Sequence, residues 1–234
     1  MVRLGSTLVV AGVTYQVGEP SQNFPLSGDI EFGVTLSSLC SPTYDKGKHD
    51  NAYELERSLY ELFNSSGILD YEQLSIQKFK FAVRLCVDVI CLSHDGNLFD
   101  AIVIAVISAL NNTKLPAFSL KNDTVIEAGG SRIINFFRIL IFFPLACHSL
   151  STHSFTTHLT GEVDSSVSVS LSCVPIPVSC ALFENKILID PSLQEDKIVD
   201  AHMSVVFGVD GSILYLRQVI SLIFYYSPHL ILTK

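Results

Sequence analysis

The most regular hydrophobic pattern of the chain has the period of an α-helix and covers residues 52–64. Apolar residues at i, i+4, i+7 and i+8 would place one face of this segment in a core: Leu55, Leu59, Leu62 and Phe63. Gly67 follows and suits the left-handed conformation in which many helices end. Residues 98–111 predict a second helix that is apolar on nearly every side, and we expect it to be buried against a sheet.

Apolar runs of strand length surround these two segments. Residues 2–17 and 29–36 predict strands, and residues 81–92 predict a buried strand. Strand patterning resumes after residue 166 and includes a hairpin across Asp210-Gly211, a strong turn dipeptide. The alternation of strands with helices, together with this hairpin, indicates an α/β or α+β layered domain.

Composition narrows the class of protein. Hydrophobic residues make up 48% and charged residues 16% of the 234 residues, which is typical of a folded chain with a substantial core. The net charge of −8 makes the chain a poor stand-alone binder of phosphate backbones, so work on nucleic acid would require positive charge from a partner. Six cysteines form no CxxC pair, and Cys86 and Cys91 in the strand pattern predict buried free thiols in a reducing compartment.

Two strongly apolar segments, residues 133–145 and 219–232, raise the question of a membrane span. The first is shorter than the roughly 20 apolar residues that a span needs, and Ser227-Pro228-His229 interrupts the second. We therefore expect no membrane span and no membrane partner; the weaker alternative is a membrane-associated form through residues 133–145. His148, His153 and His158 are spaced by five residues. Neither a helix nor a strand would place residues with this spacing on one side, so we predict no metal site and no cofactor at these histidines.

The turn between the strand of residues 81–92 and the following helix is the first candidate for chemistry. Asp95-Gly96-Asn97 leads into a helix N-terminus, where free backbone N–H groups can bind an anion. The alternative is structural: the Asn97 side chain accepts from the first helical N–H groups, and Asp100 complements the positive end of the helix dipole. The second candidate for chemistry is an acidic group that consists of Asp190, Glu195 and Asp196. Its structural alternative is a solvated turn.

The densest basic group of the chain consists of Lys78, Lys80 and Arg84. At i, i+2 and i+6 these three side chains would share one face of a strand, which would allow contact with single-stranded RNA. The alternative is a solvated sheet face that binds nothing.

Three segments resemble the RNase PH-like subunits of the exosome ring. They are MVRLGSTLVVAGV at the start, CVDVICLSHDGNLFDAIVIAVISALNNTKLP from Cys86, and ILIDPSLQEDKIVDAHMSVVFGVDGSI from Ile187. Each motif is short, but the three follow one another in the family's order. The resemblance covers most of residues 1–128 and about 167–217, and it implies an α+β fold with a mixed β-sheet layered with buried helices.

The resemblance also implies a domain organisation. Residues 1–217 would form a single RNase PH-like domain that contains an atypical insertion at residues 129–166, and residues 218–234 would form an atypical tail. The family's first strands and its C-terminal helix have no counterpart in this sequence. We therefore interpret the chain as a truncated or mis-spliced form of such a subunit.

The family's active members carry Asp-Gly-Gly-Thr-Arg where this chain has Asp95-Gly96-Asn97-Leu98-Phe99, and their arginine holds the attacking phosphate. A phenyl ring donates no hydrogen bond, and the adjacent Asp100 repels phosphate. In the first helix Arg57 matches one family arginine, while Tyr60 replaces a second. The resemblance therefore implies a non-catalytic structural subunit rather than an enzyme.

The alternative is an active phosphate-dependent 3'–5' exoribonuclease. Active members use two aspartates six residues apart together with a metal ion, and Asp190 and Asp196 keep both the residue type and the spacing. Inactive ring subunits also carry acidic residues there, so this pair alone does not restore phosphorolysis, which needs phosphate held in place.

On the first interpretation the partners would be other RNase PH-like subunits of a hetero-oligomeric ring, and RNA. The chain would support RNA processing and degradation by its neighbours in the nucleus, nucleolus and cytoplasm. RNA contact is expected at four basic residues: Arg57, Lys78, Lys80 and Arg84.

Overall fold

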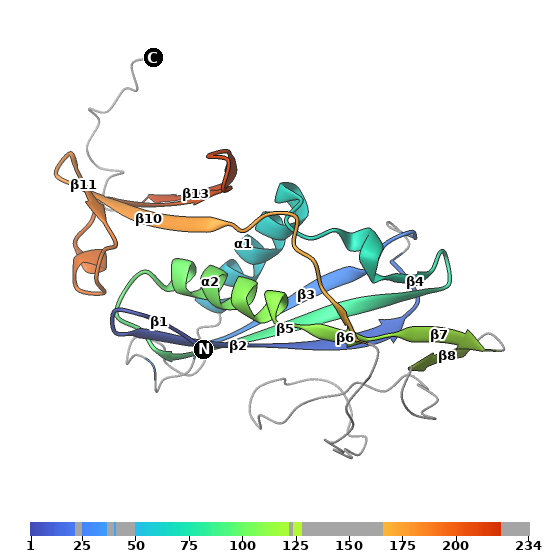
Figure 1. Ribbon diagram of the computed structural model, residues 1–234. Coiled ribbons are helices and arrows are strands. Elements are labelled where there is room, and N and C mark those ends of the chain that lie inside the picture. The colour runs from blue at the N-terminus through green and yellow to red at the C-terminus, as the bar shows by residue number, and fades with distance from the viewer. Residues whose placement is uncertain (22–24, 37–39, 41–49, 122–123, 128–165, 221–234) are drawn as a thin grey trace.

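In the computed structural model, two β-sheets enclose a pair of α-helices (Figure 1). The residues that the structure describes are 1–21, 25–36, 40, 50–121, 124–127 and 166–220. Within these residues no helix is long and apolar enough to cross a membrane. The layered α+β architecture with buried helices agrees with the predicted fold class.

The N-terminal sheet is mixed and contains five strands. Its members are β1 (Val2–Leu4), β2 (Thr7–Gly18), β3 (Asp29–Leu36), β4 (Ser75–Gln77) and β5 (Phe81–Ser93). Strand β5 pairs antiparallel with β2 and parallel with β3, so β5 is central and apolar on its helix-facing side. The strands predicted at residues 29–36 and 81–92 are therefore confirmed, with one residue added to the second.

The two helices are α1 (Asp50–Ser66) and α2 (Leu98–Asn111). The predicted apolar face of α1 is buried, and the Phe63 ring lies 5.1 Å from the Phe32 ring of β3. Gly67 ends α1 with φ +64°, the left-handed conformation expected from the sequence. Ten of the fourteen α2 residues are buried, because the helix is covered by a sheet on each side.

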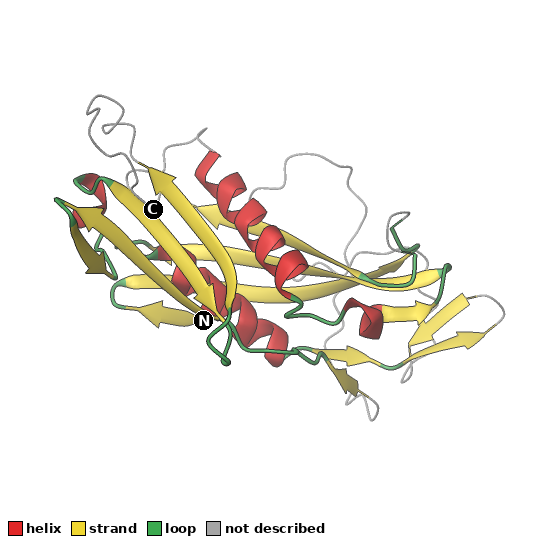
Figure 2. Ribbon diagram, turned by 90° about the horizontal axis from the view of Figure 1, so that it is seen from above, coloured by secondary structure: helices red, strands yellow, loops and turns green. Residues whose placement is uncertain are grey.

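The C-terminal sheet is antiparallel and four-stranded, in the order β11-β10-β12-β13. Its strands are β10 (Ile176–Phe183), β11 (Lys186–Ile189), β12 (Ala201–Phe207) and β13 (Ile213–Ile220). Figure 2, the view from above, shows this sheet over one end of the longer N-terminal sheet. Strand β13 includes Gln218, Val219 and Ile220, which pair with β12, so these three residues do not belong to a separate tail.

Four short strands and two short helices complete the described chain. The strands are β6 (Lys114–Pro116), which pairs with β9 (Ser166–Ser168), and β7 (Phe118–Lys121), which pairs with β8 (Thr124–Glu127). The 3-10 helices are η1 (Tyr71–Leu74) and η2 (Glu195–Lys197). Cys91 is buried, Cys86 is half-buried, and no cysteine among the described residues forms a disulfide.

Several segments that the sequence singles out lie outside the described residues. They are the apolar run 133–145, most of the apolar run 219–232, the insertion apart from Ser166, and the histidines His148, His153 and His158. The expectations for these segments stay predictions.

Candidate functional site

The turn before α2 has a constrained backbone that is held from two sides. Gly96 has φ +102° and forms an isolated β-bridge with Ser192. Thr7, which is buried, donates from its hydroxyl to the Gly96 carbonyl at 2.7 Å and accepts from the Asp95 N–H at 2.9 Å. The Leu193 N–H donates to the Asp95 carbonyl at 3.1 Å. The start of β2 and the segment after β11 therefore fix this turn together.

Asn97 does not cap α2 with its side chain, so the predicted cap is wrong. Asn97 itself has φ +45°, and its side chain makes no hydrogen bond to the first helical N–H groups. Instead Nδ2 donates to Asp190 Oδ1 at 2.7 Å. The left-handed backbone of Asn97 directs the amide toward this carboxylate, which is a stronger acceptor than a neutral partner.

Asp100 lies in the first turn of α2, as predicted, and it is buried, where it joins α2 to β10. Its Oδ2 accepts from the Ser179 N–H at 2.8 Å, and its Oδ1 accepts from the Ser179 hydroxyl at 2.7 Å. The Ser179 and Ser204 hydroxyl oxygens are 2.8 Å apart. Burial raises the pKa of Asp100, although the hydrogen bonds from Ser179 and Asn97 oppose that shift.

A cavity of ≈ 310 Å³, the loop cavity, lies beside this turn. Polar residues from several elements meet in its wall: Glu54, His94, Asn97, Ser179, Asp196, His202, Ser204 and Arg217. Phe99 also lines it, and the Phe99 ring is 6.1 Å from the Tyr215 ring, so this side chain packs against β13. The position that the family uses for an arginine is therefore apolar and buried.

Carboxylates pair with two of the basic side chains in the loop cavity. Arg217 Nη2 lies 3.0 Å from Glu54 Oε2, and His202 Nδ1 lies 3.6 Å from Asp196 Oδ1. Burial raises the pKa of Asp196, while His202 acts in the opposite direction. Asp196 lines the cavity, whereas Asp190 is exposed and contacts two wall residues, Asn97 through its carboxylate and Ser179 through its backbone N–H. A phosphate would have to compete with the Glu54 and Asp196 carboxylates for Arg217 and His202.

The Thr7 hydroxyl tests how the turn is held. We expect Thr7→Val to lower the free energy of unfolding by about 2 kcal/mol, because it leaves the Gly96 carbonyl and the Asp95 N–H without this partner. Thr7→Ser keeps the hydroxyl and serves as the control, with an expected loss of under about 1 kcal/mol. Urea unfolding followed by circular dichroism measures both. Equal losses in the two variants would contradict the role of the hydroxyl.

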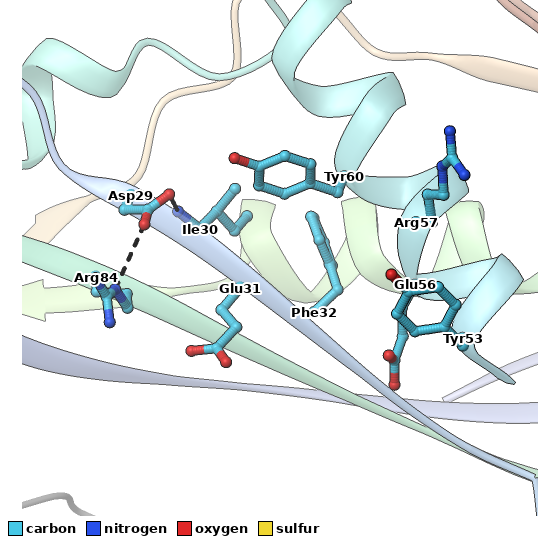
Figure 3. A pocket seen from close by; sticks show the side chains of 9 residues that line it. All are labelled: Asp29, Ile30, Glu31, Phe32, Tyr53, Glu56, Arg57, Tyr60 and Arg84. Atoms are coloured by element: carbon cyan, nitrogen blue, oxygen red, sulfur yellow. Dashed lines mark hydrogen bonds and ion pairs between the residues drawn. The ribbon is translucent and has the colours of Figure 1, made fainter. Parts of the chain in front are cut away.

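A second cavity, the helix cavity, has a volume of ≈ 430 Å³ and lies between α1 and the edge strand β3 (Figure 3). Arg57 and Arg84 both line it. Arg57 Nε is 2.8 Å from Glu61 Oε1, and Arg84 Nε is 3.5 Å from Asp29 Oδ2. Figure 3 shows the Arg57 guanidinium pointing away from the strand that carries Arg84. The two arginines therefore share a cavity wall but do not converge on one point.

Lys78 and Lys80 are not on the strand that contains Arg84, so the predicted common strand face is wrong. Both lysines lie in the turn between β4 and β5, where Phe79 has φ +68° and the Lys80 N–H donates to the Gln77 carbonyl at 3.1 Å. The turn reverses the chain before β5 begins. Arg84 lies within β5, beside Asp29. The four basic residues therefore come from three different parts of the fold: α1, the β4–β5 turn and β5.

Two stretches of the chain match descriptions of one family. Residues 1–116 match the 3' exoribonuclease family, domain 1, and residues 173–219 match domain 2 of that family. Together the two stretches cover more than half of the chain. The chain therefore belongs to the RNase PH-like 3' exoribonuclease family, as the three resembling segments predicted.

Within this family the chain is similar to proteins named exosome complex component Rrp42. That of Thermococcus kodakarensis is 32% identical over 216 residues, which are 91% of this chain and 66% of the relative. That of Methanopyrus kandleri is 29% identical over 221 residues, 93% of this chain and 69% of the relative. The chain thus spans about two thirds of the length of the curated relatives it matches.

A solved structure described as the Archaeoglobus fulgidus exosome with RNA bound to the active site has the same fold. The TM-score is 0.70 at 27% identity, and the match covers 93% of this chain and 70% of that chain. Asn97-Leu98-Phe99-Asp100-Ala101, with the helix that follows, most resembles the ring subunit called ribosomal RNA-processing protein 42, or component 7. Component 8 is the next most similar type, and the names of the relatives agree with the first.

Several residues of the loop cavity escaped the sequence analysis. Ser179, His202, Ser204 and Arg217 all come from strands, and Thr7 comes from the start of β2. One signal could have found two of them: His202 and Ser204 alternate with apolar residues along β12, which marks a polar side of a strand. No local pattern could place Thr7 beside Gly96, 89 residues away.

Proposed function

We propose that the chain is a non-catalytic structural subunit of an RNA exosome ring. In this role it pairs with other RNase PH-like subunits and supports 3'–5' RNA processing and degradation that they carry out. The support is the family membership, together with relatives named exosome complex component Rrp42. The same proposal includes a localisation of the chain in the nucleus, nucleolus and cytoplasm.

The observation that supports the non-catalytic role is that side chains at and beside the turn before α2 are already packed against, or bound to, other residues of the protein. Phe99 is buried against Tyr215 at the position where active members hold phosphate with an arginine. Asp100 accepts two hydrogen bonds from Ser179, and Arg217 is bound to Glu54. Phosphorolysis needs an anion to be positioned and its charge offset, and these groups are already engaged within the protein.

A phosphorolysis assay tests this proposal. The full chain is incubated with poly(A), inorganic phosphate and Mg²⁺, and the release of nucleoside diphosphate is measured by chromatography. We expect release no faster than in a reaction without phosphate. Asp196→Asn is run in parallel and is expected to give the same background.

The second candidate is an active phosphate-dependent exoribonuclease that uses Asp190 and Asp196. It is favoured by the presence of Asp196 in the wall of the loop cavity, with a pKa that burial raises. Phosphate-dependent release of nucleoside diphosphate that disappears in Asp196→Asn would establish this function and reject the structural role.

RNA contact is proposed at Arg57 and Arg84, which line the helix cavity, and at Lys78 and Lys80 in the β4–β5 turn. The net charge of −8 means that basic neighbours in the ring must supply most of the attraction for RNA. Co-purification of the tagged chain with RNase PH-like subunits tests the partner part of the proposal, and recovery of the chain alone would contradict it.

A further inference from the structure

The dipeptide Asp-Gly occurs twice in the chain, at residues 95–96 and 210–211, and each pair lies in a turn. In such a pair the glycine nitrogen can attack the aspartate carboxyl group, because glycine has no side chain that hinders the approach. Both aspartates are exposed, and both glycines have a positive φ, +102° for Gly96 and +81° for Gly211. The two pairs therefore differ mainly in what surrounds the glycine.

The first pair is enclosed by backbone from distant segments. Gly96 is buried, and a Cβ at this position would lie 2.3 Å from the Pro191 carbonyl oxygen. The Thr7 hydroxyl binds the Asp95 N–H and the Gly96 carbonyl, and the Leu193 N–H donates to the Asp95 carbonyl. Attack of the Gly96 nitrogen requires backbone rotation that these contacts oppose, so the fold protects Asp95 from this reaction.

The second pair lies in the exposed loop that joins β12 to β13. An added Cβ at Gly211 would meet no atom within 4 Å. The Gly211 N–H donates to the Gly208 carbonyl at 2.9 Å, and the Gly208 N–H donates to the Ser212 carbonyl at 2.8 Å. Such exposed loop hydrogen bonds open at a low free energy compared with those of the core. The Gly211 nitrogen is therefore available for attack in the folded chain.

Ser212 restrains the carboxyl group that this nitrogen would attack. Its hydroxyl donates to Asp210 Oδ1 at 2.7 Å, and its N–H donates to the same oxygen at 3.1 Å. These hydrogen bonds lower the pKa of Asp210 and so reduce the fraction of neutral carboxyl. The neutral form is the one that reacts, because its hydroxyl can leave as water. Ser212 therefore slows ring closure without covering the site.

We propose that Asp210-Gly211 is a site of spontaneous isoaspartate formation and that Ser212 slows the reaction. The Gly211 nitrogen forms a bond to Asp210 Cγ, and the proton of this nitrogen leaves with the carboxyl hydroxyl as water, which produces a cyclic imide. A second water molecule then adds to the main-chain carbonyl carbon of Asp210. The bond from that carbon to the Gly211 nitrogen breaks, and the proton returns to the nitrogen. The main chain now passes through the former side-chain carbonyl, and the composition of the chain is unchanged.

The isomerised loop is longer by one backbone carbon and carries a free main-chain carboxylate. Strand β13 follows this loop and carries two residues that contact the helices: Tyr215 packs against Phe99 of α2, and Arg217 pairs with Glu54 of α1. A longer loop alters the register between β12 and β13 where the hairpin begins. The modification therefore weakens contacts that form the wall of the loop cavity.

The experiment is a warm incubation of the full folded chain at neutral pH, followed by peptide mapping. Trypsin releases residues 85–114 and 198–217, which contain the two pairs. Chromatography separates the aspartate and isoaspartate forms, which have equal mass, and fragmentation assigns the residue. We expect isoaspartate to form at Asp210 at least about tenfold faster than at Asp95, because the fold restrains the Asp95 pair more strongly.

The same chain unfolded in concentrated urea is the control, and there the rates at Asp95 and Asp210 are expected to converge. This arm shows that the difference arises from the fold rather than from the neighbouring sequence. Equal rates at the two aspartates in the folded chain would overturn the proposal. So would a folded chain with no isoaspartate at Asp210 after a period in which the unfolded chain converts.

Two variants test the residues beside Asp210, and circular dichroism verifies that each is folded. Ser212→Ala is expected to form isoaspartate at Asp210 at least about twofold faster, because the hydrogen bond from the hydroxyl is lost. Gly211→Ala is expected to react at least about tenfold more slowly, because a Cβ now hinders the attacking nitrogen. Rates equal to that of the parent chain would contradict the role of Ser212 in the first variant and the attack by the Gly211 nitrogen in the second.

Discussion

Substituting Gly96 by alanine is expected to lower the free energy of unfolding by about 3–5 kcal/mol. A Cβ at this position would lie 2.3 Å from the Pro191 carbonyl oxygen and 2.8 Å from the Leu193 nitrogen. Both are backbone atoms of the segment that leads into η2, so they cannot rotate away as a side chain would. Gly96 also has φ +102°, a conformation that side-chain-bearing residues rarely adopt.

Gly12→Ala is the control for Gly96→Ala. Gly12 lies in β2 with no atom within 4 Å of an added Cβ, so a change within about 0.5 kcal/mol is expected. Calorimetry measures both, and the Gly96 variant should melt at least about 6 °C below the parent chain. Equal melting temperatures for the two variants would show that the turn and the segment after β11 separate at little cost.

The strands and helices could be predicted largely from the sequence, because their periodicity is a local property. Strand β3 begins and ends where predicted, and so does α2, whose apolar circumference requires a cover on both sides. The four apolar positions of α1 are buried because they recur with the helical period. These elements depend on neighbours within a few residues of one another.

The predictions that failed depend on backbone conformation or on distant contacts. Lys78, Lys80 and Arg84 have strand spacing, but the positive φ of Phe79 creates a turn that spacing does not reveal. Asn97 has the residue type of a helix cap, yet its own left-handed conformation and Asp190, 93 residues away, decide its hydrogen bond. Residue type and spacing therefore predict an element better than they predict the partner of a polar side chain.

In the candidate site, too, residue type and spacing did not predict the contacts of the side chains. The aspartates at 190 and 196 keep the family's spacing, but the structure places only Asp196 in the cavity wall. The loss of the family arginine at Phe99 is visible in the sequence alone, whereas the packing of Phe99 on Tyr215 is not. Sequence comparison identified the missing group, and the fold shows that an apolar contact has taken its position.

Asp100→Ala is expected to lower the free energy of unfolding at neutral pH by about 2–4 kcal/mol. The substitution removes the acceptor for both the N–H and the hydroxyl of Ser179, which is itself buried, so two donors lose their partner. Asp100→Asn keeps one acceptor oxygen and adds an N–H group that can donate to the Ser179 hydroxyl. We expect it to lose about 1 kcal/mol or less.

The pH dependence of stability separates the charge of Asp100 from its hydrogen bonds. Burial raises the pKa of Asp100 above its usual value of 3.8, so the folded chain holds this proton more tightly than the unfolded chain does. Asp100 therefore contributes its full stabilisation below pH 3.8, and this contribution is lost as the pH rises through the folded pKa. Asparagine does not titrate, so the stability of the parent chain relative to Asp100→Asn should fall as the pH rises through that window. Chemical unfolding between pH 3 and pH 7 measures the difference, and an opposite slope would mean that the hydrogen bonds from Ser179 outweigh burial.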